Sequence, residues 1–219
     1  MKTIERNQTL GEIVTHFPKA AEIFKAHRID FCCGGDRTLA QAAKEDEVNE
    51  KTLLNTLNEQ KEKLTETASV QYVDMDNGQL IDHIVNTHHS YLNRELPVIS
   101  ALSQKVLKAH GENHPELFDV FKDFHALKSE LEQHLIKEEV PLFPAMLKAD
   151  NDADLQTEIE DEHEGAGDLL KKLRQENQDF TVPKDACESY SLLYKKLEEL
   201  ESDVFQHVHL ENNILFQRF

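Results

Sequence analysis

Six histidine and glutamate residues interrupt the apolar stripes of four amphipathic segments. They are His89, His134, Glu138, His163, His207 and Glu211. Each glutamate comes four residues after a histidine, so the two side chains stack on one helix face, one turn apart. An ionised carboxylate inside a helical core is costly without a partner. Because two such carboxylates lie among four histidines, the pattern predicts a pair of metal ions in the core.

The donor types narrow the choice of metal. Imidazole and carboxylate together suit iron, zinc and manganese. Zinc usually takes four ligands in a compact tetrahedral site. Six ligands shared by two ions favour two iron ions bridged by the glutamates, with manganese as the alternative. A single inward histidine is most often a hydrogen-bonded core residue, but four of them on four segments do not fit that interpretation.

The elements that position these residues are expected to be helices. The chain has only 7 Gly and 6 Pro, and apolar residues recur at intervals of three and four almost throughout. We expect an all-α protein with four long helices, over residues 79–109, 115–147, 152–178 and from Pro183 onward. Joined by short connections, such helices form an up-down-up-down four-helix bundle.

Residues 1–65 are expected to form a small helical module of four short helices. Their start signals are a capping-box pattern from Thr9 to Glu12, Pro18 in a first turn, and Thr38 and Asn49 as N-caps. Residues 66–78 break the helical pattern and are expected to form a linker. The bundle then occupies residues 79–219.

Two adjacent cysteines, Cys32 and Cys33, precede two glycines and a helix expected to start near Thr38. A helix start and a turn of backbone N–H groups lower a thiol pKa. The pair is therefore a candidate redox thiol, a metal or nitrosyl acceptor, or a docking point for a damaged cluster. A buried turn with inert thiols is the alternative. Cys187 is expected mid-helix as an ordinary apolar residue.

The bulk composition excludes several classes of partner. Lys and Arg number 24 against 42 Asp and Glu, a formal net charge of -18. Such a surface repels phosphate backbones and anionic lipid, so neither nucleic acid nor a membrane is an expected partner. The chain lacks a signal-peptide pattern and any apolar run of roughly 20 residues, so a cytoplasmic location is expected. Three cysteines argue against a disulfide framework.

The ligand pattern as a whole resembles the hemerythrin-like fold, and the segment Asp30–Gly35 resembles the ScdA-type N-terminal domain. Together and in this order they are similar to the repair-of-iron-centres family over nearly the whole chain. The resemblance implies a carboxylate- and oxo-bridged di-iron protein that repairs iron–sulfur clusters damaged by nitrosative and oxidative stress. Repair would proceed by iron donation, NO removal or both, with damaged iron–sulfur proteins and NO or another diatomic molecule as partners.

Two positions refine what the resemblance implies. His110 ends the first long helix, where the helix dipole favours a histidine; the family pattern instead suggests a further ligand. Oxygen-carrying hemerythrins have a second histidine one turn after the third-helix ligand, where this chain has Gly167. The more open site suits NO binding or iron release, and the resemblance implies an enzymatic nitric oxide reductase activity. A sensor or store without turnover stays open as the alternative, as does the choice between monomer and homodimer.

Overall fold

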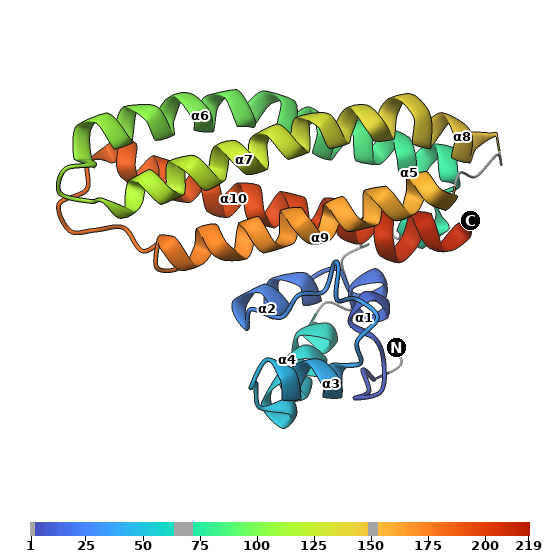
Figure 1. Cartoon of the computed structure of the whole chain (residues 1–219). Coiled ribbons are helices and arrows are strands. Elements are labelled where there is room, and N and C mark those ends of the chain that lie inside the picture. Colours follow the sequence, from blue (N-terminus) through green and yellow to red (C-terminus); the bar gives the residue numbers. More distant parts are fainter. Residues whose placement is uncertain (1–2, 64–71, 149–152) are drawn as a thin grey trace. The chain divides into compact units, whose positions relative to one another are not determined.

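The computed structural model describes residues 3–63, 72–148 and 153–219 (Figure 1). Within these ranges the secondary structure is helical, apart from one isolated antiparallel bridge between Thr9 and Thr38. The predicted all-α class is thus confirmed. The contacts divide the chain into two compact units, residues 1–80 with 206–219, and residues 81–205. None of the described helices is long and apolar enough to cross a membrane.

The first unit contains the short helices that the start signals predict. They are α1 Leu10–His16, α2 Ala20–Ala26, α3 Leu39–Glu45 and α4 Glu50–Lys63. The unit also contains η1 Tyr72–Asp74 and the start of α5 Asn77–Ile84, with η4 Glu211–Leu215 and η5 Phe216–Arg218 from the C-terminal end. The capping boxes of Thr9 and Thr38 are both formed. Asn49 Oδ1 accepts a hydrogen bond from the backbone N–H of Thr52 at 2.9 Å. Pro18 precedes α2 instead of starting it.

Residues 206–219 pack into this first unit beside α1. The Gly11 N–H donates to the Gly35 carbonyl at 2.8 Å, so two glycines bring the backbone of α1 against the turn after the cysteines. The side chain of Asn213 fills the space beside both glycines and donates from Nδ2 to the Cys32 carbonyl at 3.0 Å. The predicted linker lies partly outside the described residues, which omit 64–71, so the predicted domain boundaries stay a prediction.

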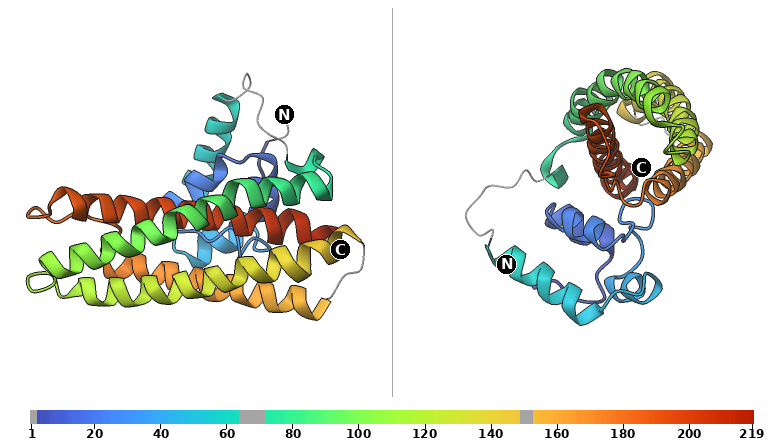
Figure 2. Two further views of the ribbon diagram at one scale, coloured as in Figure 1. Left: turned by 90° about the horizontal axis from the view of Figure 1, so that it is seen from above. Right: turned by 90° about the vertical axis from the view of Figure 1, so that its left-hand side faces the viewer.

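The second unit contains the long helices and is a helical bundle. Its elements are the end of α5, then η2 Val85–His89, α6 Ser90–His110, α7 Glu116–Lys137, η3 Glu138–Leu142, α8 Phe143–Leu147, α9 Ala153–Glu176 and α10 Glu188–Leu210 up to residue 205. The end-on view in Figure 2 shows these helices around a shared core. Leu96, Ile99, Phe124, Leu127, Leu170, Tyr190 and Leu197 are buried there. The predicted up-down-up-down order stays a prediction.

Two boundaries of the long helices differ clearly from those expected. The fourth long helix begins at Glu188, not at Pro183, because Pro183 opens a turn in which its carbonyl accepts from the Ala186 N–H at 3.1 Å. The second long helix is α-helical only to Lys137 and then passes through a π-helical turn that contains Pro141. Proline has no N–H to donate, so it disturbs the regular α-helical ladder at that point.

Ion pairs join neighbouring helices of the bundle. Lys172 Nζ on α9 lies 2.5 Å from Asp123 Oδ2 on α7 and 3.7 Å from Glu176 Oε1. Burial, and then the neighbouring Asp123 carboxylate, raise the pKa of Glu176 to about 7. Glu176 therefore keeps its proton in the folded protein at pH values where the unfolded chain has lost it.

We predict that Glu176→Gln stabilises the protein at pH 8. Because the folded pKa of Glu176 is raised, the parent loses stability as the pH rises from about 4.5 to about 7. The variant lacks this loss, so its free energy of unfolding should exceed that of the parent by about 3 kcal/mol at pH 8 and match it near pH 4. Urea unfolding from pH 4 to pH 8 measures the free energy of unfolding of the parent and of the variant. A difference between them that does not change with pH would contradict the raised pKa of Glu176.

We predict that Gly11→Ala destabilises the first unit. A Cβ at this position would lie 2.2 Å from Asn213 Oδ1, and such overpacking costs about 1–3 kcal/mol. Asn213→Ala removes the clashing atom, so the double variant should lose less stability than the two single variants added together. Urea unfolding of the four proteins forms the cycle. Strictly additive losses would show that Gly11 and Asn213 are not in contact.

Candidate metal centre

Three π-helical turns carry three of the predicted metal ligands. His89 is the last residue of η2, while Glu138 and Glu211 are the first residues of η3 and η4. π-helical turns are rare and occur frequently at functional sites. The two histidine–glutamate pairs nevertheless meet as their spacing predicts. Nε2 of His134 lies 3.1 Å from Glu138 Oε1, and Nε2 of His207 lies 3.0 Å from Glu211 Oε1.

The Glu138 carboxylate is surrounded by imidazole nitrogens. Its side chain exposes none of its surface, and Nε2 atoms of three histidines approach it: His89 at 3.3 Å, His134 at 3.1 Å and His163 at 3.8 Å. The Nε2 atoms of His134 and His163 are themselves 3.1 Å apart. Burial opposes ionisation of Glu138, but these histidines outweigh it and hold its pKa well below the usual range.

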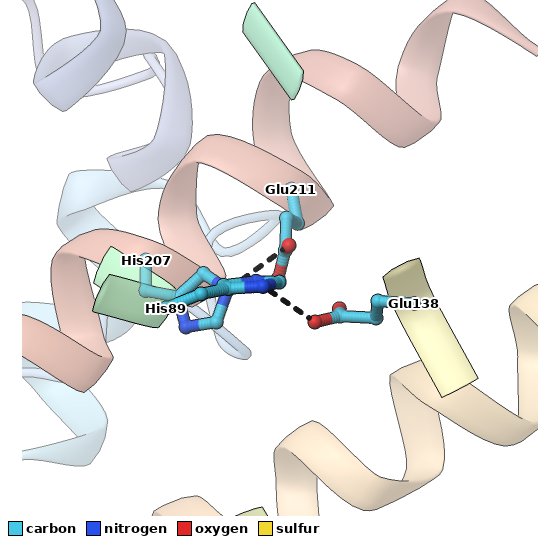
Figure 3. Close-up of side chains that lie close together, drawn as sticks. All are labelled: His89, Glu138, His207 and Glu211. Atoms are coloured by element: carbon cyan, nitrogen blue, oxygen red, sulfur yellow. Dashed lines mark hydrogen bonds and ion pairs between the residues drawn. The ribbon is translucent and has the colours of Figure 1, made fainter. Parts of the chain in front are cut away.

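The donor atoms form two overlapping groups, and within each group all four atoms lie within 4.8 Å of one another. One group is His89, Glu138, His207 and Glu211, whose side chains Figure 3 shows turned toward one another. The other is His134, Glu138, His163 and Glu211. All of these residues are buried, and both glutamates occur in both groups. Either group could hold a metal ion.

Two family models and several curated proteins match this chain. The model of ScdA_N, a domain of unknown function, matches residues 6–61, and the hemerythrin HHE cation binding domain matches residues 80–219. The chain is 32% identical to the iron-sulfur cluster repair protein ScdA of Staphylococcus haemolyticus, over 222 residues that cover 99% of each protein. It is 33% identical to YtfE of Yersinia pseudotuberculosis, over 216 residues that cover 97% of this chain and 96% of the relative.

The chain belongs to the ScdA/YtfE family of iron–sulfur cluster repair proteins. A probable repair protein of Haemophilus influenzae is similar to the same extent, at 34% identity over 96% of both proteins. The family resemblance inferred from the motifs is thereby confirmed. The second half of the chain is a cation-binding domain whose buried histidine and glutamate groups suit a metal.

The structure does not bring His110, the seventh residue suggested by the ScdA/YtfE pattern, to these groups. His110 closes α6, a helix of 21 residues that starts directly after His89, so about 30 Å of helix separates the two. Its Nε2 instead lies 3.2 Å from Cys187 Sγ. Its ring packs against the ring of Tyr190, with the two ring centroids 5.3 Å apart. Cys187 is exposed and precedes α10, so the mid-helix apolar position expected for it was wrong.

The paired cysteines of the ScdA-type domain lie in a turn organised by Asp30. Its Oδ1 accepts the backbone N–H groups of Cys32 and Cys33, each at 3.1 Å, and the Cys32 thiol at 3.3 Å. The two Sγ atoms are 3.8 Å apart. The expectation of a lowered thiol pKa is wrong for Cys32. The hydrogen bond with Cys33, then burial and the Asp30 charge, raise the pKa of Cys32 well above its usual value.

Acidic residues behind the histidines were missed by the sequence analysis. His89 Nδ1 bonds Glu139 Oε1 at 2.8 Å, and His134 Nδ1 bonds Glu162 Oε2 at 2.9 Å. The neighbour of His89, His88, bonds Asp203 Oδ1 through its own Nδ1 at 3.0 Å. The sequence offers one weak signal, because Glu139 and Glu162 each stand directly beside a predicted ligand. Surface glutamates are too common in this chain for that signal to be selective.

We predict different effects of two histidine substitutions on bound iron. His110→Ala should keep the iron content of the parent, because the residue lies at the far end of α6. His163→Ala should lose about half of the iron or more, because it removes a donor from one of the two groups. Elemental analysis of anaerobically reconstituted protein gives the iron content, with circular dichroism as the control for folding. Equal losses in both variants would contradict the distinction.

Proposed function

We propose that this chain is a di-iron protein that repairs damaged iron–sulfur clusters. The observation that carries the proposal is the sharing of Glu138 and Glu211 by the two donor groups. Two adjacent ions bridged by carboxylates require this arrangement, whereas a single ion does not. Mixed imidazole and carboxylate donors suit iron. The relatives over nearly the full length are named iron–sulfur cluster repair proteins, which supports the same activity here.

The residues around the site fit a pair of ions. The ring nitrogens of His89 and His134 that face Glu138 are both Nε2, and a carboxylate holds Nδ1 of each ring, as is usual for metal-bound histidine. All six donor residues are buried. When bound, iron supplies a centre that takes up small ligands and from which iron can be given to another protein. The six residues are the proposed ligands.

Gly167 supports an open site that favours release and small ligands. It is buried on α9 one turn after His163 and has no side chain to offer as a donor. We propose damaged iron–sulfur proteins as the partners, iron donation as one route of repair, and removal of NO as the other. A reductase activity toward NO would belong to the second route. The cytoplasm, where such target proteins are made, is the proposed location.

The test combines iron content with repair. Protein loaded with iron and purified without oxygen should hold two iron ions per chain and show the absorption of a bridged ferric pair on oxidation. Added to an enzyme whose [4Fe–4S] cluster NO has damaged, it should restore activity, whereas metal-free protein and a Glu138→Leu variant should not.

Three outcomes would go against the proposal. One iron per chain would exclude a di-iron site. Two irons without any restored activity would exclude repair and leave a sensor or store. Repeated conversion of NO to N2O without cluster repair would identify a reductase instead of a repair protein.

A further inference from the structure

Two glutamates lie directly behind the histidines His89 and His134. The rings have the same arrangement. Each turns Nε2 toward Glu138, at 3.3 Å for His89 and 3.1 Å for His134. Each turns Nδ1 toward a second carboxylate, Glu139 at 2.8 Å and Glu162 at 2.9 Å. Both rings are therefore held between an inner and an outer carboxylate.

The outer carboxylate determines which nitrogen of the ring is available for a metal. A neutral imidazole carries one N–H and one lone pair. A carboxylate accepts only from an N–H, so when a metal ion takes the lone pair of Nε2, the proton on Nδ1 is the one that the outer carboxylate accepts. The negative charge of the carboxylate at Nδ1 also makes Nε2 a more basic ligand for a metal. Glu139 and Glu162 thus orient and strengthen His89 and His134 without lying next to the metal themselves.

The two outer carboxylates act on different donor groups. His89 belongs to one of the two overlapping groups and His134 to the other. Glu139 follows Glu138 in η3, and Glu162 precedes His163 in α9, so each stands beside one ligand and bonds a histidine from another element. Each hydrogen bond therefore ties two ligand-bearing elements together.

The two outer carboxylates also differ in their surroundings. The Glu139 side chain is 41% exposed, whereas Glu162 is 32% exposed and pairs with Lys137. Lys137 also pairs with Glu158, whereas the carboxylate hydrogen-bonded to His134 Nδ1 is that of Glu162. Replacing Glu158 therefore perturbs Lys137 without removing the carboxylate behind His134, which provides a matched control for Glu162.

We propose that Glu139 and Glu162 are positioning residues that each control one of the two metal ions. Glu139 acts through His89 and Glu162 acts through His134. This inference rests on the proposed di-iron site. It states that the binding of each of the two ions depends on its own outer glutamate. Loss of one outer carboxylate should weaken the binding of one ion and leave the binding of the other unchanged.

The experiment measures iron release from the full-length, iron-loaded protein to a ferrous chelator. Glu139→Gln and Glu162→Gln keep a side-chain oxygen that can accept from Nδ1 but remove the charge. Each should raise the dissociation constant of one iron per chain roughly 10- to 100-fold, and the combination should affect both irons. Glu139→Ala, which also removes the acceptor, should have a larger effect than Glu139→Gln. The ferric absorption of the single variants should shift as well.

Two controls separate positioning from general damage. Glu158→Gln perturbs Lys137, and Glu130→Gln removes an exposed carboxylate on α7, so both should release iron as the parent does. Thermal unfolding of the metal-free proteins should be unchanged by Glu139→Gln.

The outcomes distinguish this inference from the proposed function. A parent with two irons whose release is unchanged in both Glu139→Gln and Glu162→Gln would overturn the positioning role alone. So would equally weakened binding of both irons in each single variant, because each ion would then not depend on its own outer glutamate. A parent that cannot hold two irons would overturn the di-iron proposal, and this inference with it.

Discussion

The burial of a charged carboxylate among imidazoles is the constraint on which the centre of this protein depends. Glu138 exposes no surface, and its oxygens face ring nitrogens from three separate segments. Taking an ionised carboxylate out of water is costly unless its partners are held in position. Those segments must therefore keep a fixed register along the bundle. The π-helical turns at His89 and Glu138 are local departures from α-helical geometry at that level.

Other buried carboxylates of the bundle have a different kind of partner. Glu95 pairs with Lys196 at 2.8 Å, and Glu201 accepts from Arg174 Nε at 2.7 Å. Charged lysine and arginine side chains donate hydrogen bonds but have no lone pair with which to bind a metal, so a carboxylate paired with them forms an ion pair between helices. Imidazole has a lone pair. A buried carboxylate that faces lysine or arginine thus marks an ion pair between helices, whereas one that faces imidazoles marks a place where a metal cation can bind.

Local rules explain which parts of the molecule were predictable. The capping boxes at Thr9 and Thr38 and the i, i+4 stacking of His134 on Glu138 depend on residues a few positions apart, and these features are present. The helix start at Glu188 was missed because Pro183 is as compatible with a turn as with a first helical position.

The functional residues whose surroundings were not predicted from the sequence differ from these in one respect. The surroundings of Cys32 and the partner of His110 depend on burial and on residues far away in the sequence. The outer glutamates were missed for the same reason. Their sequence neighbours mark them only weakly, and the histidines that they bond lie 50 and 28 positions away. Spacing along a helix says which side chains share a face, but not which side chain of another helix meets it.

The packing of residues 206–219 against α1 has a consequence for synthesis of the chain. Domains usually fold in order as they leave the ribosome, the N-terminal one first. Here Gly11, Gly35 and Cys32 find their partner in Asn213, which is translated some 180 residues after Cys32. The N-terminal helices therefore cannot complete their packing until the segment that carries Glu211 has emerged. The nascent protein would hold its cysteine turn incompletely packed until the last donors for the metal are made.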